Sequence, residues 1–225
     1  MTSTEPCDPG RLRADAAANR AKLLDAARTV FGREGVAAPL TTVAAEAEVG
    51  IATLYRRFPD RESLLLAAYG EAVVDLARNV AVALAEADPW EGFAGLVTRL
   101  GEIEARNRGF THVGQSMAPG SRRTAAVQDR GYRSVVQVLQ RAKDAGVLRE
   151  DITPEDLPVL SFAIAGILGA TRDDVPEAWR RHVALFLDAC RPVAAKAPLP
   201  APTDPTLLHR AVIRSTRRRE SPASR

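Results

Sequence analysis

The stretch VGIATLYRRFPDRESL, Val49 to Leu64, decides the fold that the sequence predicts. A short helix is expected from Ile51 to Arg57. The Pro59-Asp60 break ends it and opens a longer helix, because an aspartate in this position accepts hydrogen bonds from helix-start amides. Leu54 and Phe58 lie one turn apart and should point to the same side. The short helix is therefore expected to be fixed against a core, with its opposite face outward.

Two helices are expected upstream of this stretch. A second helix should run from Thr42 to Ala47 with Thr41 as its N-cap, which leaves a three-residue turn before Ile51. A first helix, ending at Gly35, is indicated by apolar residues at helical spacing, namely Leu23, Ala26, Ala27, Val30 and Phe31. Three helices with this short turn predict a helix-turn-helix, a motif that places its last helix in the major groove of DNA.

The rest of the chain also reads as helical, and we find no sustained strand alternation and no internal repeat. A fourth helix follows Asp60, and Asp88-Pro89 resembles the start of a fifth that continues to about Arg106. Further helices are expected over about 122–145, ending at Gly146, from Thr153-Pro154-Glu155-Asp156 to about Thr171, and over about 175–190. The predicted fold class is all-α, with a three-helix DNA-binding domain joined to a larger helical bundle.

We expect four segments along the chain. Residues 1–15 should be a flexible arm and residues 16–62 the helix-turn-helix domain. Residues 63–195 should form the helical regulatory and dimerisation domain. Residues 196–225 should be a disordered basic tail rich in Pro and Ala.

Charge gives weak support for nucleic-acid binding. The net charge is +3 over 225 residues, but beyond Ala195 seven basic residues face two acidic ones, so this excess lies in the tail. The DNA-binding face must be basic through the placement of its residues. Cys7 and Cys190 lie in unrelated contexts, and the N-terminus has no secretion signal, so we expect a cytoplasmic protein without a membrane span.

Catalytic and metal chemistry are not expected. The three histidines, His112, His182 and His209, are far apart and have no neighbouring acid or thiol ligands. Ser116 lacks the full nucleophile-elbow pattern and follows no strand. We expect no enzyme activity, no metal and no cofactor.

The outward face of the short helix provides candidate DNA contacts. Base reading is expected from Ile51, Ala52, Thr53 and Arg56, through thymine methyl contacts and hydrogen bonds. Phosphate contacts are expected from Thr42, Tyr55, Arg57 and Arg61, which flank this face.

Residues 18 to 70 resemble the TetR family of bacterial transcriptional regulators. The resemblance rests on ordered elements: Phe31, Thr41-Thr42-Val43, Ala44-Ala45, Val49-Gly50, Thr53-Leu54-Tyr55, Phe58-Pro59 and Asp60-Arg61-Glu62. It implies an Ω-like helical dimer with a small DNA-binding domain and a larger ligand-binding and dimerisation domain. Glu48 departs from the family pattern, which often has glycine there, and a left-handed conformation at Glu48 would cost about 1 kcal/mol or somewhat more.

Candidate ligand-pocket and dimer residues come from the apolar positions of the later helices. For the pocket we expect Phe93, Leu96, Val97, Leu100, Phe110, His112, Val113, Gln115, Met117, Tyr132, Val136, Leu139 and Phe162. For the dimer interface we expect Leu160, Ala163, Ile164, Ile167, Trp179, Val183, Phe186 and Leu187, in an intersubunit four-helix bundle. Both sets would also suit an ordinary helical core.

These features together predict a homodimeric repressor that binds a near-palindromic double-stranded operator and is released by an unknown small-molecule effector. Two alternatives stay open. The chain could be an architectural protein or activator with the same helix-turn-helix and no small-molecule ligand. It could also be a helical-bundle enzyme or ligand carrier.

Overall fold

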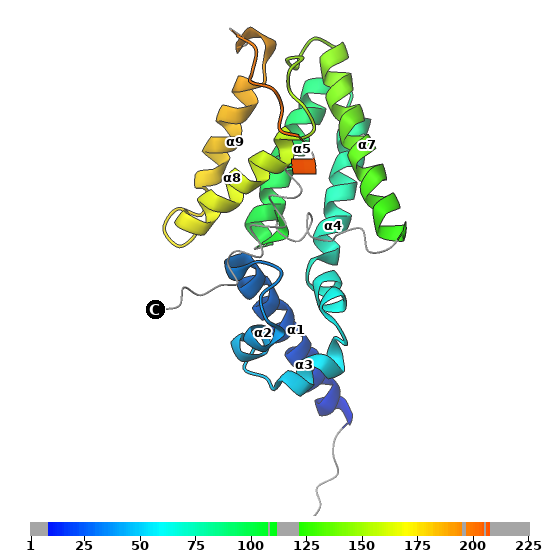
Figure 1. The fold of residues 1–225 in the computed structure, drawn as a ribbon, viewed down its shortest axis with the longest axis vertical. Helices are drawn as coiled ribbons and strands as arrows, with labels where there is room; N and C mark the ends of the chain where they lie inside the picture. Colours follow the sequence, from blue (N-terminus) through cyan, green and yellow to red (C-terminus); the bar gives the residue numbers. More distant parts are fainter. Residues whose placement is uncertain (1–8, 108, 112–121, 195–196, 205, 208–225) are drawn as a thin grey trace, which may run out of the picture.

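A computed structural model describes residues 9–107, 109–111, 122–194, 197–204 and 206–207, with side chains from residue 17 onward except at 122–129 and 194. All regular structure in these ranges is helical, as the sequence predicts (Figure 1). The helices are α1 (Pro9–Glu34), α2 (Leu40–Glu46), α3 (Ile51–Arg57), α4 (Arg61–Ala85), α5 (Pro89–Arg106), α7 (Arg122–Asp144), α8 (Asp156–Thr171) and α9 (Ala178–Ala189), followed by a 3₁₀ turn (Pro192–Ala194).

Helices α1 to α3 lie at one end of the molecule, and α3 has the predicted bounds. The N-cap prediction for α2 was wrong, because Pro39 holds that position and Thr41 lies inside the helix. The buried Leu40 belongs to the core and starts the helix before Thr41. Helix α1 begins at Pro9, inside the segment for which we expected a flexible arm.

The turn between α2 and α3 is closed by a left-handed residue, Glu48, with φ 55°. The Glu48 amide donates to the Ala45 carbonyl and the Val49 amide to the Ala44 carbonyl, both at 3.0 Å. These two bonds form a Schellman motif, in which the left-handed position usually holds glycine. Glu48, which stands where the family pattern often has glycine, is therefore a strained residue. The turn that it closes fixes the direction of α3.

Helix α4 is a single helix that joins the two halves of the molecule (Figure 1). It begins with a capping box in which the Asp60 carboxylate accepts from the Ser63 amide at 2.7 Å, as the sequence predicted for Asp60. Its first part, with Leu64 and Tyr69, packs into the core of α1–α3, whereas Val80 and Ala83 pack into a second core. Leu76 lies between these cores and contacts both.

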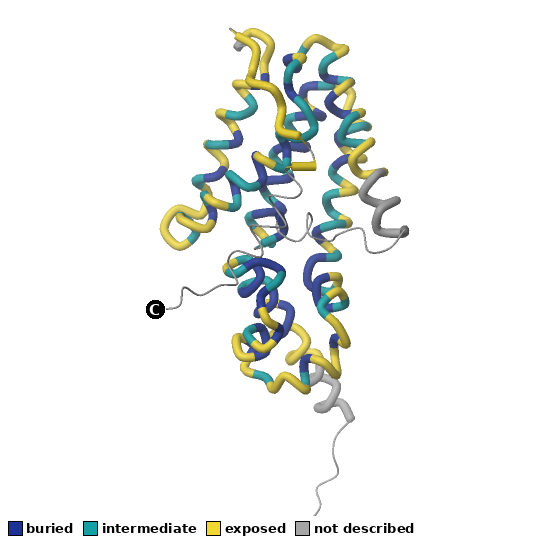
Figure 2. Tube along the Cα trace, in the orientation of Figure 1, coloured by how far each residue is buried: buried dark blue, intermediate teal, exposed yellow. Residues whose placement is uncertain are grey.

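The second core lies between α4, α5, α7, α8 and α9, and Figure 2 shows the buried residues along their inner faces. Helix α5 has the predicted start, since the Asp88 carboxylate accepts from the Trp90 and Glu91 amides and Pro89 follows it. Gly101 allows Trp179 to pack against α5, because a Cβ there would lie 2.2 Å from the indole ring. Trp179 is consequently 1% exposed.

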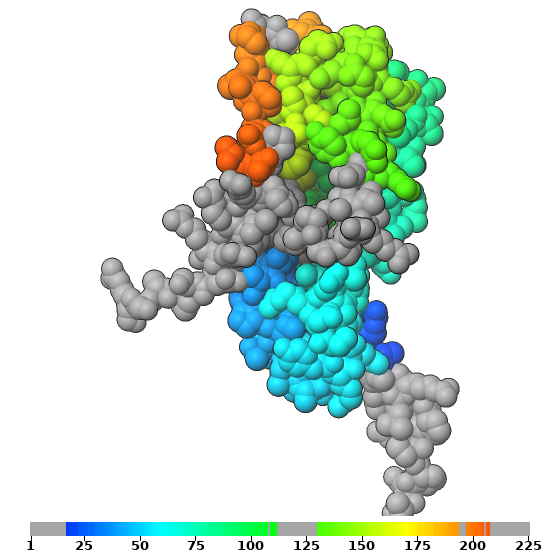
Figure 3. Space-filling view, turned by 45° about the vertical axis from the view of Figure 1, so that its right-hand side comes forward, coloured from blue at the N-terminus to red at the C-terminus, as the bar shows by residue number. Residues whose placement is uncertain are grey.

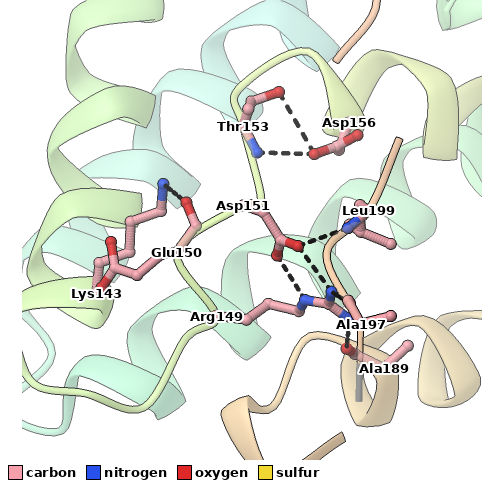
Figure 4. A network of polar contacts seen from close by, with 9 residues as sticks. All are labelled: Lys143, Arg149, Glu150, Asp151, Thr153, Asp156, Ala189, Ala197 and Leu199. Carbon is pink, nitrogen blue, oxygen red and sulfur yellow. Dashed lines mark hydrogen bonds and ion pairs between the residues drawn. The ribbon is translucent and has the colours of Figure 1, made fainter. Parts of the chain in front are cut away.

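A polar network attaches the chain after α9 to the body of the protein (Figure 4). The buried Arg149 guanidinium contacts both Asp151 carboxylate oxygens, at 2.6 and 2.8 Å, and donates to the Ala197 carbonyl at 3.0 Å. The Asp151 carboxylate also accepts from the Leu199 amide at 2.8 Å. Residues 197–204, which we call the strap, therefore lie against the body at the start of the segment expected to be disordered.

No helix in the described ranges is long and apolar enough to cross a membrane. In the same ranges, no cluster of three or more His, Cys, Asp or Glu side chains could hold a metal ion.

Candidate nucleic-acid interface and ligand cavity

Helix α3 presents a mixed apolar and polar face to solvent. Leu54 is fully buried and Phe58 is 5% exposed, so this side of the helix is held in the core of α1–α3. On the opposite side Ile51 is 37% exposed and Tyr55 is 50% exposed. Figure 3 shows α3 and the first part of α4, in cyan, at the surface of this end of the molecule.

The other predicted base readers lie on or beside the same face. Ala52 and Arg56 are exposed and Thr53 is half-buried. The Arg56 guanidinium donates to the Thr53 hydroxyl at 3.4 Å, so these two side chains lie together along the helix. The structure therefore brings the four predicted base readers together on one exposed surface.

The predicted phosphate contacts divide into two groups. Tyr55 and Arg57 are exposed on α3, and Thr42 is half-buried on α2. Arg61 is differently placed: its guanidinium donates to the Val36 and Ala38 carbonyls, each at 2.6 Å, and lies 5.9 Å from the centre of the Phe31 ring. Arg61 thus braces the loop between α1 and α2, and its guanidinium is engaged there and not on the exposed face of α3.

An arginine of α1 pairs with acidic residues of α1 and α2. Arg33 lies 2.8 Å from the Glu34 carboxylate and 3.5 Å from that of Glu46. On α3, the exposed side chains that can donate hydrogen bonds to DNA are those of Tyr55, Arg56 and Arg57. The basic side chains exposed on α3 are thus Arg56 and Arg57.

A cavity of about 230 Å³ lies between α4, α5, α7 and α8 in the other half of the molecule. Its walls are mostly aliphatic and aromatic, with few polar atoms. The lining residues are Leu76, Leu96, Leu100, Glu104, Phe110, Thr111, Tyr132, Val135, Pro154, Leu157, Pro158 and Ser161.

The structure places four predicted pocket residues in this lining, namely Leu96, Leu100, Phe110 and Tyr132. Phe93, Val97 and Leu139 are buried in the core of the bundle, while Val136 and Phe162 are half-buried outside the lining. His112, Val113, Gln115 and Met117 lie outside the described residues.

Glu104 is the lining residue that the sequence reasoning missed. Its side chain is 2% exposed and accepts a hydrogen bond from the Thr111 hydroxyl. Burial raises the pKa of Glu104 to about 8, against smaller opposing effects of Thr111 and the Arg172 guanidinium. The signal was present in the sequence, because Leu96, Leu100 and Glu104 share one face of α5 at a spacing of four residues.

The cavity wall continues into the core of the DNA-binding half. Phe110 lines the cavity and also packs into the core of α1–α3, together with Ile103 of α5. Between them Gly109 has φ 78°, and a Cβ on Gly109 would lie 2.8 Å from Gly32 Cα of α1. The chain around Gly109 therefore touches both the cavity and α1.

The predicted dimer residues form two groups, those with side chains buried in their own subunit and those with side chains that are partly exposed. Leu160, Ile164, Trp179 and Val183 are at most 3% exposed because they fill the core of their own subunit, so they do not offer surface to a partner. Ala163, Ile167, Phe186 and Leu187 are half-buried. The exposed positions of the same helices include Val159, Gly166, Gly169, Ala170 and Leu185.

The fold and the exposed α3 define a helix-turn-helix protein, and the comparisons identify its family. Residues 23–68 match the model of the bacterial regulatory proteins of the tetR family. A TetR transcriptional regulator of Streptomyces coelicolor is 34% identical to the chain, with 77% of this chain and 98% of that chain covered and a TM-score of 0.45. The chain belongs to the TetR family of transcriptional regulators.

Solved structures with lower identity support the fold. A TetR family transcriptional regulator of Thermus thermophilus, PfmR, is 22% identical with a TM-score of 0.55, over 75% of this chain and 96% of that chain. A gamma-butyrolactone receptor is 16% identical with a TM-score of 0.57, over 92% of this chain and 100% of that chain. No curated protein sequence matches the chain significantly.

Proposed function

We propose that the protein is a homodimeric transcriptional repressor that binds a near-palindromic operator through α3 and is released by a small-molecule effector. The observation that carries the proposal is the position of α3. Leu54 and Phe58 fix one side of this helix in the core, and Ile51, Tyr55 and Arg56 are exposed on the other. A helix held in this way can enter the major groove without losing the packing that orients it.

Base reading would come from Ile51, Ala52, Thr53 and Arg56, and phosphate contacts from Thr42, Tyr55 and Arg57. A hydrogen bond to a charged phosphate is worth about 1.5–3 kcal/mol. Two symmetric α3 helices would read half-sites separated by about 34–36 Å in successive major grooves.

The dimer would form through the exposed faces of α8 and α9 (Figure 2). Gly166, Gly169 and Ala170 have little side-chain bulk, and Val159 and Leu185 are 44% and 57% exposed. Small exposed residues allow two helices to approach closely, while the apolar ones supply buried area. A Gly166→Arg variant should remain folded and sediment as a monomer. Gly131→Arg makes the same substitution at an exposed position on α7 and should remain a dimer.

Effector release is supported by the connection from the cavity to α1. A ligand in the cavity would contact Phe110 and Thr111, next to Gly109, which lies against Gly32. It would shift the equilibrium between two dimer conformations only if it binds one of them more tightly. The conformation with the wrong α3 separation would leave the operator.

The proposed DNA binding is tested with the DNA upstream of the protein's own coding region. Tyr55→Ala and Arg56→Ala should each weaken binding about tenfold or more, measured by fluorescence anisotropy at moderate salt. Tyr55→Phe reports on the hydroxyl alone. Arg130→Ala removes the same charge as Arg56→Ala from an exposed position on α7. Equal effects of Arg56→Ala and Arg130→Ala, or no effect of either α3 variant, would overturn the proposal.

A reporter placed behind the operator separates repression from activation. Deletion of the regulator should raise reporter expression, whereas a fall in expression would favour the activator alternative. A helical-bundle enzyme or carrier would leave reporter expression unchanged.

A further inference from the structure

The cavity contains one carboxyl group among the side chains of its described lining residues. Glu104 lies among Leu96, Leu100, Phe110 and the Tyr132 ring. The Tyr132 hydroxyl donates to Glu155 at 3.0 Å, so this group already has a partner in the protein. The remaining polar side chains of the lining, Thr111 and Ser161, are neutral.

Such a carboxyl group is costly to keep in a protein core. An ionised carboxylate buried in an apolar environment is strongly destabilised, and the group stays protonated instead. An aliphatic residue of similar size would fill the same space of α5 without this cost. Thr111 provides one hydrogen bond to Glu104 but no compensating charge.

Two further groups lie close enough to Glu104 to interact with it electrostatically. Arg172, which follows α8, donates to the Ala105 carbonyl at 2.9 Å and acts on Glu104 at longer range. Tyr69 of α4 is buried, and its own pKa is raised partly by the nearby Glu104. Neither group outweighs the effect of burial, which raises the pKa of Glu104 to about 8.

A ligand with a positive charge would supply what this carboxyl group lacks. An ammonium offers several N–H donors and the opposite charge, and an apolar body would fill the aliphatic and aromatic walls. The rings of Phe110 and Tyr132 can also attract a cation. An anionic ligand would meet a like charge or a protonated acid, and no basic side chain is present among the described lining residues.

We propose that the effector is a small lipophilic amine whose ammonium group pairs with the Glu104 carboxylate inside the cavity between α4, α5, α7 and α8. This inference rests on the proposed ligand-responsive function, because it names the chemical class of that ligand. A volume of about 230 Å³ restricts the ligand to a small molecule, below the roughly 300–1,000 Å³ of drug-sized sites.

The binding step includes the loss of a proton. At neutral pH the free protein holds Glu104 as a neutral acid, and an alkylamine with a pKa near 10 enters as an ammonium. Pairing converts the acid into a carboxylate, and its proton is released to solvent, close to one per ligand. The affinity for the amine should therefore rise with pH up to about pH 8 and then level off.

Phenylbutylamine, phenylbutanol and phenylbutyrate provide a matched set of probes that differ in the polar end. The amine should bind the purified dimer about tenfold more tightly than the alcohol, measured by isothermal titration calorimetry at pH 7.5, and the acid should bind most weakly. In Glu104→Gln the preference for the amine should disappear. Glu102→Gln, a nearby carboxyl substitution on α5 outside the cavity lining, should retain the preference.

Calorimetry in buffers with different ionisation enthalpies measures the released proton. Near pH 7 the wild type should release close to one proton on binding phenylbutylamine, and Glu104→Gln should release none. Equal or tighter binding of the alcohol or the acid, no binding of the amine, or no proton release would each overturn the proposal.

These measurements contain no DNA, so they are independent of the proposed repressor function. If the amine binds through Glu104 but operator affinity does not fall, the amine is not the effector, although the cavity is still an amine-binding site. Loss of operator affinity caused only by neutral or acidic probes would support a ligand-responsive repressor and exclude the amine class.

Discussion

Replacing Glu104 by glutamine is expected to stabilise the protein at neutral and alkaline pH. The buried carboxyl group has a pKa raised from 4.5 to about 8. The unfolded chain loses this proton near pH 4.5, whereas the folded protein keeps it until about pH 8. The free energy of unfolding should therefore be fully retained below pH 4.5 and should fall as pH rises through this range.

The size of this effect follows from the pKa difference. A tenfold change in the ionisation equilibrium corresponds to about 1.4 kcal/mol. The destabilisation by Glu104 should reach about 3 kcal/mol at pH 7 and about 5 kcal/mol above pH 8. Glutamine has no titrating proton and retains an oxygen acceptor for Thr111. Between pH 5 and pH 8 the advantage of Glu104→Gln over the wild type should increase by about 4 kcal/mol.

Urea unfolding followed by circular dichroism at pH 5, 6, 7 and 8 measures this difference, with the protein concentration held constant. Only the change with pH is compared, because the glutamine amide also alters packing to an equal extent at every pH. Glu102→Gln controls for removal of a partly exposed carboxyl group from the same helix. Parallel stability curves for the wild type and Glu104→Gln across this range would refute the reasoning.

Three further substitutions test the backbone positions and the strap. Glu48→Gly should raise stability by about 1 kcal/mol by relieving the left-handed strain at φ 55°; an unchanged or lower urea midpoint would count against this. Gly109→Ala should lower the midpoint, because its Cβ would meet the backbone of Gly32, and normal stability would contradict that contact. Arg149 holds the pKa of Asp151 well below its ordinary range, so this carboxylate is ionised at neutral pH, and Asp151→Asn should speed tryptic cleavage of the Lys196–Ala197 bond at the start of the strap. Equal cleavage rates of the wild type and Asp151→Asn at the neutral pH where trypsin acts would argue against the attachment.

Local chemistry made much of the fold predictable from the sequence. Helix α3 has the expected bounds, and the caps at Asp60 and Asp88 are where short-range patterns indicate them. Gly146, with φ 67°, ends α7 as predicted. Such features depend on residues within one helical turn, so the sequence contains all the information they need.

Features set by distant residues were not predictable in the same way. Arg61 binds carbonyl groups at Val36 and Ala38, more than twenty residues away, and no local pattern indicates this contact. Helix α8 is apolar nearly all round, so its sequence could not separate the core-facing Ile164 from the exposed Gly166. The side of a uniformly apolar helix is decided by its neighbours in space.

Glu104 is an intermediate case. Its position on the inner face of α5 follows from the spacing with Leu96 and Leu100, so its burial could have been deduced. That its neighbours from α7 and α8 leave a cavity rather than a filled core depends on tertiary packing. The sequence could thus have predicted a buried carboxyl group at the candidate ligand site, but not the volume of the cavity around it.

The continuity of α4 limits how this regulator could be recombined with others. An engineer who wishes to attach its cavity-containing half to a different DNA-binding domain would normally cut in a loop, but here the boundary between the two cores falls inside a helix, near Leu76. Ile103 and Phe110 follow this boundary in the chain, yet they complete the core of α1–α3. A chimaera joined at Leu76 would have to keep these two side chains, or repacked replacements for them, to preserve the fold of its DNA-binding domain.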